Sequence, residues 1–450
     1  MFRTPNLLLA SLALLAACGG PSKEEKQEAQ ADNPAQTVTT PAATAVNLPT
    51  PYATKSTTKR VNIVAWPAGK TPTAPAGFTV AEYASKMQSP RWIYVAPNGD
   101  VLVAESSTIP TTTKKKVAAT LNLDKSRSLR EESANRITLF RDTNKDGKPD
   151  LHTTFLANLR QPFGMLVLGN SFYVANTDGV LRFPYEPGAT KITGQGQKIL
   201  DLPAGGYNNH WTRNLLASPD GTKIFVTVGS GSNVMEHGAE NEMRRANILE
   251  INPDGSGEKI YASGLRNPVG MAWAPGTKTP TLWTAVNERD ELGDELVPDY
   301  MTSVKEGGFY GWPYAYFGPN EDPRRKGERP DLVQKTLVPD VPLGAHTASL
   351  GLAFYDKAAF PEKYRNGAFI GQHGSWNRTA YSGYKVVFVP FANGKPSGPP
   401  EDFLTGFLVG GDSKDAYGRP VGVTTLPDGS MLVADDAADR IWRVSATAGS

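Results

Sequence analysis

The stretch that decides the fold runs Asn208-Asn-His-Trp-Thr-Arg-Asn-Leu-Leu-Ala-Ser-Pro-Asp-Gly-Thr-Lys-Ile-Phe-Val-Thr-Val-Gly229. Two short β-rich runs lie on either side of a Pro-Asp-Gly turn, a pattern typical of a β-hairpin. His210 and its polar neighbours come just ahead of the first run. We therefore expect His210 at the end of a strand, or on the loop leading into it, where its side chain can face a cleft. For a histidine taken alone, a polar surface loop is the alternative.

The same phrase recurs from Val61 onward: a polar or proline lead, an apolar run, a turn and a second apolar run. The copies stand roughly 50 to 80 residues apart, which leaves room for a four-stranded sheet in each. They begin at Ser89, Arg160, Asn208, Arg266, Ser349 and Arg419. This repetition predicts an all-β fold, a six-bladed β-propeller of four-stranded antiparallel blades, because a β-sandwich would not repeat one phrase six times.

In a propeller, the loops that lead into the innermost strands gather at one end of the central channel. The polar residues just ahead of each apolar run should therefore converge into one site. These residues are Arg91, Gln161, His210, Arg266, Asn267 and Arg419.

Composition is that of a globular, turn-rich protein. Of 450 residues, 39% are hydrophobic and 20% charged, and the chain contains 44 glycines and 36 prolines, which is typical of a fold with few long helices. A net charge of +2 gives no strong overall field, and no nucleic-acid motif appears, so no nucleic-acid partner is expected. The single cysteine, Cys18, excludes an intrachain disulfide and a cysteine-based metal cluster.

The N-terminus predicts a bacterial lipoprotein. An apolar run over residues 7–17 follows a short basic start and is too short to span a bilayer. The sequence Leu15-Ala-Ala-Cys18-Gly19 matches the lipoprotein signal, so residues 1–17 are the expected signal peptide and Cys18 the lipidated residue that anchors the chain to the membrane. An ordinary secretory peptide with an incidental cysteine is the alternative. Because no acidic residue follows Cys18, we expect the periplasmic face of the outer membrane in a Gram-negative cell envelope.

Residues 18–60 are predicted to form a flexible tether ahead of the propeller at 61–450. From about Pro21 to Lys59 the chain is rich in Ala, Thr, Pro, Gln and Glu and has almost no large apolar side chains. Such a segment is not expected to bury enough surface to fold, and it would hold the propeller off the membrane.

The lead positions supply one potential base, two amides and several guanidinium groups. No Gly-x-Ser-x-Gly, His-Glu-x-x-His or P-loop motif is present, which argues against hydrolysis by a triad. Clustered arginines suit a small polyanionic ligand, because each guanidinium can pair a carboxylate bidentately. A histidine among them can serve as a general base.

Several phrases together carry a resemblance to a known family. They are Gln161-Pro-Phe-Gly164, His210 with Arg213, Gly264-Leu-Arg-Asn-Pro-Val-Gly-Met-Ala272, Asp294-Glu295, Gly307-Gly-Phe-Tyr-Gly-Trp-Pro313 and Arg419-Pro-Val-Gly422. With them, residues 77–444 resemble the soluble quinoprotein glucose/sorbosone dehydrogenases, which are six-bladed propellers, and the sorbosone dehydrogenase-like branch above all. The resemblance implies pyrroloquinoline quinone (PQQ) and Ca²⁺ as cofactors, and a quinone or cytochrome as the partner that accepts electrons.

The reaction implied is the oxidation of an aldose, or of a related polyol or sugar aldehyde such as sorbosone, in the periplasm. By analogy His210 takes the proton of the substrate hydroxyl, and Arg266 stabilises the negative charge that develops on the quinone. Gln161 and Asn267 would bond the polar edge of the cofactor, and Arg419 would pair one of its carboxylates. Three residues stand near the family's fifth-blade cation, with Arg378 favoured: His373, Arg378 and Lys385.

One departure from the family concerns the base. The aspartate that orients the catalytic histidine in the glucose enzymes would fall near Ser230. His210 would then be less well oriented, unless Glu236 or Glu240 substitutes for that aspartate.

Calcium ligands are expected at two places. The family's Gly-Pro carbonyls that bind catalytic calcium correspond roughly to Arg289-Asp290, which makes Asp290 the candidate in the channel. The second place is a loop whose oxygen ligands alternate around a glycine turn, like the first half of an EF-hand without its twelfth-position glutamate. Its candidate ligands are Asp142, Asn144, Asp146 and Asp150, with a plain polar turn as the alternative.

Two other functions stay open. A calcium-dependent lactonase can also use a six-bladed propeller, but it needs carboxylates and asparagines on one metal, whereas the lead positions here are mainly cationic or amide. A catalytically silent, membrane-anchored propeller that binds a glycan or a protein is the other alternative, and Ser230 is the residue that keeps it open.

Overall fold

The predicted hairpin forms the inner half of one blade. In the computed structural model, which describes residues 22–42, 44–110, 113–121, 123–411 and 413–447, β13 (Leu215–Ala217) pairs antiparallel with β14 (Ile224–Val228). β15 (Asn247–Ile251) and β16 (Lys259–Ser263) extend this sheet outward, and the short β20 (Gly308–Phe309) joins its outer edge in parallel.

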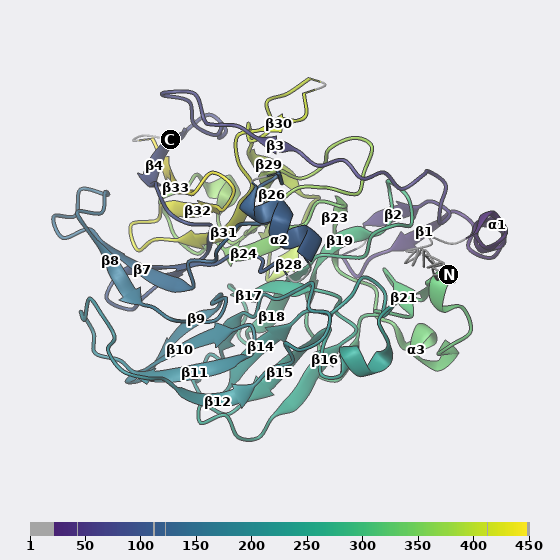
Figure 1. Cartoon of the computed structure of the whole chain (residues 1–450), viewed down its shortest axis with the longest axis horizontal. Coiled ribbons are helices and arrows are strands. Elements are labelled where there is room, and N and C mark those ends of the chain that lie inside the picture. The colour runs from purple at the N-terminus through teal and green to yellow at the C-terminus, as the bar shows by residue number, and fades with distance from the viewer. Residues whose placement is uncertain (1–21, 43, 111–112, 122, 412, 448–450) are drawn as a thin grey trace, which may run out of the picture.

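Five further sheets of the described residues repeat this plan, so the predicted six blades surround a central channel (Figure 1). Each begins at its inner strand with one of the sequence repeats. The first two of these blades contain β5 (Pro90–Val95), β6 (Val101–Glu105), β7 (Arg136–Arg141) and β8 (Leu151–Leu156), and then β9 (Met165–Leu168), β10 (Ser171–Asn176), β11 (Gly179–Pro184) and β12 (Gln197–Asp201). The next two contain β17 (Pro268–Ala274), β18 (Thr281–Val286), β19 (Pro298–Ser303) and β23 (Val341–Ala345), and then β24 (Ser349–Phe354), β25 (Ala368–Gln372), β26 (Lys385–Val389) and β29 (Glu401–Leu404). The last blade contains β31 (Pro420–Thr425), β32 (Met431–Asp435) and β33 (Arg440–Ala446) together with β4 (Phe78–Ala84).

The ring is closed by the two ends of the propeller. β4 comes from the N-terminal side of the first blade and pairs antiparallel with β33, from Ala84 opposite Ile441 to Phe78 opposite Ala446. The last blade therefore contains strands from both ends of the domain, and closure removes the open edge that an incomplete ring would leave.

A glycine in the repeated phrase lets neighbouring blades approach closely. A Cβ on Gly351 of β24 would lie 2.1 Å from the Val421 carbonyl oxygen of β31, and one on Gly422 would lie 2.7 Å from the Arg91 carbonyl oxygen. Apolar side chains of the inner strands fill the remaining space, among them Leu350 and Val421 in one buried cluster. The glycines are thus a packing requirement, which explains their recurrence.

The N-terminal segment differs from the predicted tether. It forms α1 (Lys23–Asp32) and a hairpin of β1 (Gln36–Thr39) and β2 (Ala45–Leu48), and β3 (Asn62–Ile63) pairs in parallel with β30 (Asp415–Ala416). Leu48 is only 2% exposed and packs in a cluster with Tyr300 and Tyr316 of the propeller. A few apolar side chains suffice for this docking because the propeller supplies the partner surface, so the prediction of a flexible segment was wrong for the described part.

The remaining elements are short. They are α2 (Thr113–Thr120), α3 (Pro330–Lys335), β21 (Ala315–Tyr316), β22 (Asn320–Glu321), β27 (Phe391–Ala392) and β28 (Lys395–Pro396), with 3₁₀ turns at Ala239–Glu242, Pro323–Arg325 and Glu362–Tyr364. Among the residues that the structure describes, no helix combines the length and apolar character needed to cross a bilayer. The predicted signal peptide and Cys18 lie outside the described residues.

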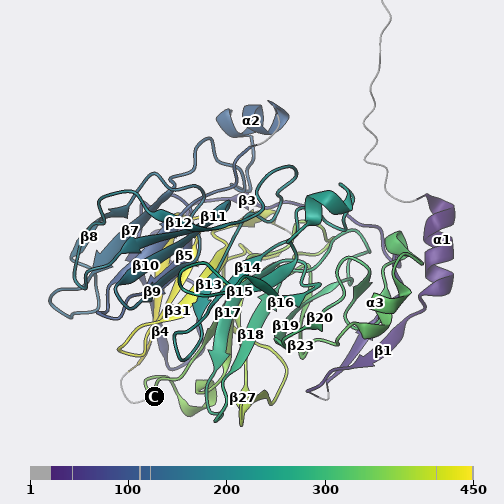
Figure 2. The same cartoon turned by 90° about the horizontal axis from the view of Figure 1, so that it is seen from below.

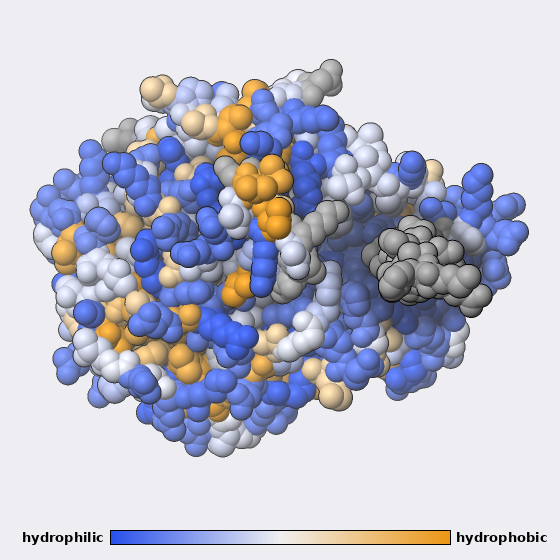
Figure 3. Space-filling model, in the orientation of Figure 1, coloured by the Kyte–Doolittle hydropathy of each residue, from blue (hydrophilic) through white to orange (hydrophobic). Residues whose placement is uncertain are grey.

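The first blade carries a long insert between β6 and β7 that contains α2. In Figure 1 α2 lies over the centre of the ring, and in Figure 2 it projects from one end of the propeller, so the two views place it above that end of the channel. Val117, Leu121 and Leu123 of this insert are 49%, 61% and 60% exposed. Figure 3 shows apolar surface over α2, surrounded by mostly hydrophilic surface.

Candidate active site

The loops ahead of the inner strands open into a cavity of about 890 Å³ at the end of the channel below α2. Five of the six predicted lead residues line it: Arg91, His210, Arg266, Asn267 and Arg419. Gln161 is not among the lining residues. Its side-chain amide instead donates to the Ser107 carbonyl oxygen at 2.9 Å and holds the neighbouring loop.

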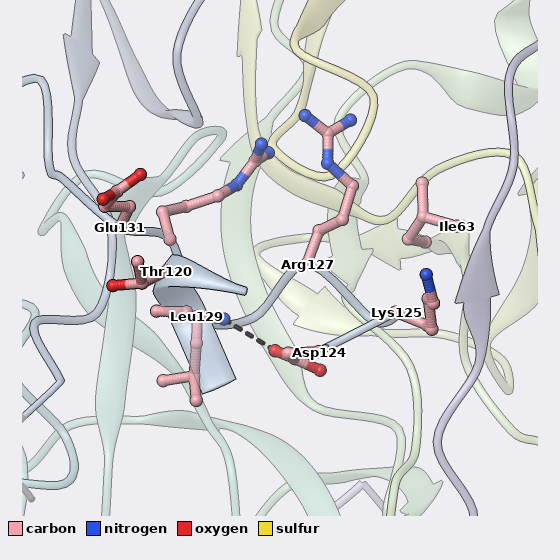
Figure 4. Close-up of a pocket in the computed structure, with 9 residues that line it drawn as sticks. Ile63, Thr120, Asp124, Lys125, Arg127, Leu129 and Glu131 are labelled. Carbon is pink, nitrogen blue, oxygen red and sulfur yellow. Dashed lines mark hydrogen bonds between the residues drawn. The ribbon is translucent and has the colours of Figure 1, made fainter. Parts of the chain in front are cut away.

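The insert adds a second, smaller hollow beside the main cavity. This hollow has a volume of about 430 Å³. In Figure 4 Glu131 and Leu129 of the insert lie on one side of it, and Lys125 and Ile63 lie on the other. The Asp124 carboxylate accepts a hydrogen bond from the Leu129 amide at 2.7 Å, which fixes the turn after α2. This turn forms part of the wall of the main cavity, because Asp124 and Leu129 line both spaces.

His210 is buried and oriented by one residue. Its Nδ1 lies 2.9 Å from both the carbonyl oxygen and the hydroxyl oxygen of Ser230, and that hydroxyl donates to the Ser232 carbonyl oxygen at 2.7 Å. Both Ser230 oxygens therefore accept, so Nδ1 carries the proton and Nε2 keeps its lone pair. Burial, reinforced by the positive charge of Arg266, holds the pKa of His210 well below its usual 6.5. The ring is neutral, as a general base must be.

Ser230 takes the place of the aspartate that orients the catalytic histidine in the glucose enzymes. Ser230, the position predicted from the family, contacts the histidine, but it does so through oxygens that carry no charge. Glu236 does not substitute, since its carboxylate accepts the Asn233 and Val234 amides, and no hydrogen bond joins Glu240 to His210 in the described chain. The tautomer is fixed without a carboxylate hydrogen bond to the ring in the described chain, and the nearby Asp290 charge only partly offsets the burial that lowers the pKa of His210.

Arg213 holds the backbone of the same loop. Its fully buried guanidinium donates to the carbonyl oxygens of His210 at 2.6 Å and of Pro203 at 2.8 Å. Burial and the nearby Arg245 lower the pKa of Arg213 to about 9. Arg213 thus fixes the loop that carries the base.

Arg266 belongs to a cluster that includes a residue which the sequence prediction missed, His346. The Asp290 carboxylate lies 3.3 Å from Arg266 Nη2 through one oxygen and 3.3 Å from His346 Nδ1 through the other. Burial alone would raise the pKa of Asp290, but the His346 hydrogen bond and the Arg266 charge outweigh it and lower that pKa. His346 stands three residues ahead of β24, at the lead of the fifth repeat, so its position in the repeat could have identified it.

Arg419 is a cavity cation for which the described ranges show no acidic partner within ion-pair distance. It donates to the carbonyl oxygens of His373 at 3.0 Å and Gly374 at 3.2 Å and to Ser128 Oγ at 2.9 Å. Arg91, by contrast, pairs with Asp436 at 2.5 Å. The full charge of Arg419 is therefore available to an anionic ligand.

The fifth-blade cation is not where it was predicted. Arg378 forms an ion pair with Glu295 and is absent from the cavity lining, while Lys385 pairs with Asp402 at 2.6 Å. His373 does line the cavity, and it contacts Asp436 through Nε2 at 2.8 Å. Burial and the neighbouring Arg419 lower the pKa of His373 to about 4, so it is neutral at pH 7.

The calcium loop orders itself through its own backbone. Asp142 accepts the Gly147 amide at 2.7 Å, Asp146 accepts the Lys148 amide at 2.8 Å, and Asp150 accepts the Thr143 amide at 3.1 Å. No group of three or more acidic, His or Cys side chains converges as a metal site in the described ranges. The converging ligand set that was predicted for Asp142, Asn144, Asp146 and Asp150 is not formed, and calcium binding at this loop stays a prediction.

Protein donors occupy the carbonyl oxygen of Asp290, the candidate calcium ligand of the channel. The backbone carbonyl oxygen of Asp290 accepts Arg324 Nη1 at 2.9 Å and Asn233 Nδ2 at 3.2 Å, so both of its lone pairs are used. Calcium binding at Asp290 would require these donors to move, and it stays a prediction.

A planar polyanion such as PQQ does fit the remaining polar groups. Asn267 Oδ1 is buried without a hydrogen-bond partner in the described chain, although buried acceptors are rarely left unpaired. A ring N–H of the cofactor can satisfy this oxygen, and Arg419 can pair a carboxylate. His210 Nε2 remains for the substrate.

Comparisons with known proteins agree with the predicted family and fold. The family described as Glucose / Sorbosone dehydrogenase matches residues 174–375, and a TrAA12-like family matches residues 329–447. An uncharacterized protein of Borreliella burgdorferi is 32% identical over 303 residues, covering 65% of this chain and 77% of that protein. The aldose sugar dehydrogenase YliI of Escherichia coli is 34% identical over 200 residues, 43% of this chain and 46% of that enzyme. The holo PQQ domain of a Coprinopsis cinerea pyranose dehydrogenase has a TM-score of 0.65 at 20% identity, over 86% of this chain and 100% of that domain.

Proposed function

Because the chain belongs to the glucose/sorbosone dehydrogenase family, we propose that it is a PQQ-dependent dehydrogenase of an aldose sugar or a related sugar aldehyde. The observation that carries the proposal is the pairing of a neutral, oriented His210 with an arginine, Arg419, that has no acidic partner within ion-pair distance among the described residues. A base and an unneutralised cation facing one cavity suit the oxidation of a sugar hydroxyl by an anionic quinone.

Each residue has a distinct role in this proposal. When bound, PQQ supplies a quinone that accepts the hydride of the substrate carbon. His210 Nε2 takes the proton of the substrate hydroxyl, and the Ser230 carbonyl holds the ring in the tautomer that can do so. Arg419 and Asn267 bind the cofactor. Arg266 has its nitrogens engaged by protein oxygens, so it acts through its positive charge and its fixed position.

The location and the final electron acceptor belong to the proposal as well. We place the enzyme on the periplasmic face of the outer membrane, attached through lipidated Cys18, on the strength of the N-terminal signal sequence. A quinone or a cytochrome would then reoxidise the cofactor. The lactonase alternative loses support, because the described residues bring no set of three carboxylate or histidine ligands together.

A titration tests the proposal. Purified protein without residues 1–18 should bind one equivalent of PQQ, with binding monitored through the absorbance of the cofactor. It should then reduce an artificial electron acceptor with at least one sugar of an aldose panel.

Substitution of Arg419 by Met should weaken this binding by about tenfold or more, because a charge-assisted hydrogen bond to a carboxylate is lost. Arg160→Met, at a 60% exposed side chain paired to Asp178 on the surface, is the matched control and should bind as the parent does. Absence of PQQ binding by the parent would refute the proposal.

The pH dependence of turnover follows from the state of His210. A general base works only when unprotonated, and burial and Arg266 lower the pKa of His210 well below 6.5. The neutral imidazole of His210 therefore persists as the pH falls through 6.5, and it is lost only at more acidic values. We expect kcat of the PQQ-saturated enzyme not to fall as the pH is lowered from about 7 to 6. A fall by half near pH 6.5, with the fold intact by circular dichroism, would contradict the assignment.

A further inference from the structure

We propose that the insert of the first blade docks on the lipid surface of the membrane, so that the cavity of the candidate site opens toward the bilayer. The insert comprises residues 106–135 and contains α2. The proposal rests on the lipidation of Cys18, which belongs to the proposed function. Three observations carry it: the apolar side chains that the insert holds in solvent, the charge beside them, and the end of the propeller at which α1 starts.

The insert presents an apolar patch, which consists of Val117, Leu121 and Leu123. The Leu121 amide donates to the Val117 carbonyl oxygen at 3.0 Å, which places Leu121 one helical turn beyond Val117 on the same face. Val117 is about half exposed, and the two leucines are more than half exposed. Hydrophilic surface surrounds the patch in Figure 3. An apolar patch with a polar rim is typical of a surface that contacts a membrane or a partner.

The insert is fixed to the propeller at the mouth of the cavity. Arg127 donates to the Ala437 carbonyl oxygen at 2.6 Å, and Arg130 donates to the Asp439 carboxylate at 2.9 Å. Leu123 also lines the cavity, so the apolar patch lies at its opening. These contacts hold the leucines in solvent instead of letting them pack against the blades.

The charge of the insert suits an anionic lipid surface. The insert contains six basic and three acidic side chains. Arg127 and Arg130 pair with Asp439 of the last blade, whereas the exposed Lys116 and Lys125 flank the apolar patch in the sequence. In segments that lie in a membrane interface, apolar side chains enter the headgroup region while neighbouring lysines face the anionic lipids. The insert shows this combination.

The direction of α1 indicates which end of the propeller meets the membrane. α1 leads into β1, and in Figure 2 β1 lies farther from the α2 end than α1 does, so the chain enters α1 from the α2 end. Lys326 of the propeller pairs with Glu28 of this helix at 3.2 Å. The four residue steps from Cys18 to the N-cap Ser22 span at most about 14 Å, and the ten residues of α1 span about 15 Å. A lipidated Cys18 therefore cannot reach past the far end of α1, which puts the bilayer at the end that bears α2.

The test measures which surface of the lipidated protein meets the bilayer. Leu123→Cys carries a polarity-sensitive fluorophore on its thiol, and Thr222→Cys carries the same label as the matched control. Thr222 is exposed in the turn between β13 and β14, at the other end of the inner strand from the loop of His210. Cys18 is the only natural cysteine, and its lipidation blocks it from labelling. In vesicles of phosphatidylethanolamine and phosphatidylglycerol, brominated lipids should quench the label at position 123 by roughly half or more and leave the label at position 222 unchanged.

A second measurement separates the insert from the anchor. Protein without residues 1–18 keeps every described residue and should bind the same vesicles weakly. Leu121→Ser combined with Leu123→Ser should lower its partition coefficient by about tenfold, because two leucine side chains no longer leave water. Ile260→Ser is the control, since Ile260 is a 52% exposed apolar residue on β16, away from the insert, and it should leave the partition coefficient unchanged.

Each result supports or overturns the proposal. Quenching of neither label, or of the label at position 222 alone, would place the cavity away from the bilayer. A label at position 123 that vesicles leave unchanged, while a soluble c-type cytochrome shifts its emission, would replace the lipid surface by a protein partner. Equal partitioning of the double leucine variant and its parent would remove the insert from the contact.

The experiments also distinguish this inference from the proposed function. Neither measurement involves PQQ, so a chain that fails to bind the cofactor would overturn the proposed enzyme and leave the docking surface standing. A mature protein whose mass shows no acyl chain on Cys18 would overturn the anchor and the orientation derived from it.

Discussion

His210→Ala should bind PQQ with the affinity of the parent protein and lose turnover by about a thousandfold, the usual contribution of a positioned general base. The loss is expected in kcat, because the histidine acts on the proton of the bound substrate and leaves Arg419 and Asn267 in place for the cofactor. The measurement is kcat and KM for the best sugar of the panel, together with the Kd for PQQ from the absorbance titration.

His346 cannot replace His210 in that variant. Both ring nitrogens of His346 are engaged by Asp290 and Gly293, and His373 Nε2 contacts Asp436. His152→Ala is the matched control, since His152 is an exposed residue on β8 whose ring stacks on Phe140. It should retain the kcat of the parent. If His210→Ala turned over as fast as the parent with PQQ bound, the base would lie elsewhere.

The comparison of sequence with structure shows where local patterns are informative. Each inner strand was predictable because its apolar run, its turn and its glycine all serve the same packing against the next blade, as Gly351 against Val421 illustrates. The lead residues converged for the same reason, since the topology of a closed propeller dictates where the loops before the inner strands meet. A repeated local pattern thus predicted a global arrangement.

The failures have a common physical origin in tertiary contacts that no local pattern encodes. The segment with Leu48 looked unable to fold, yet it docks on a surface made by Tyr300 and Tyr316, which are far away in the sequence. The role of Asp290 could not be predicted, because the direction of its carbonyl depends on Arg324. These residues come together only in the assembled fold, so no local sequence pattern could have predicted their contacts.

The buried ion pairs around Arg289 should also dominate the stability of the fold. Arg289 is fully buried and contacts two carboxylates, Glu288 through Nε and Asp322 through Nη1, at 3.0 Å each. Nη1 also donates to the Pro313 carbonyl oxygen, and Nη2 donates to that of Ala315. Arg289→Met should lower the free energy of unfolding by about 3–5 kcal/mol, because it leaves buried charge without its partner. The effect exceeds that of an ordinary core truncation of one methyl group.

Of the two carboxylates, Glu288 would be the one left uncompensated. Asp322 retains Arg324 at 2.8 Å, whereas Glu288 has no second cation within ion-pair distance in the described ranges, and its other oxygen already lacks a hydrogen bond. The double variant Glu288→Gln with Arg289→Met should therefore recover part of the loss, which a urea denaturation series of the single and double variants would measure. Arg329→Met is the matched control, because Arg329 pairs with Asp331 at the surface with exposed fractions of 47% and 52% and should leave the denaturation midpoint nearly unchanged. A midpoint for Arg289→Met equal to that of Arg329→Met would mean that the buried charges contribute nothing to the stability of the fold.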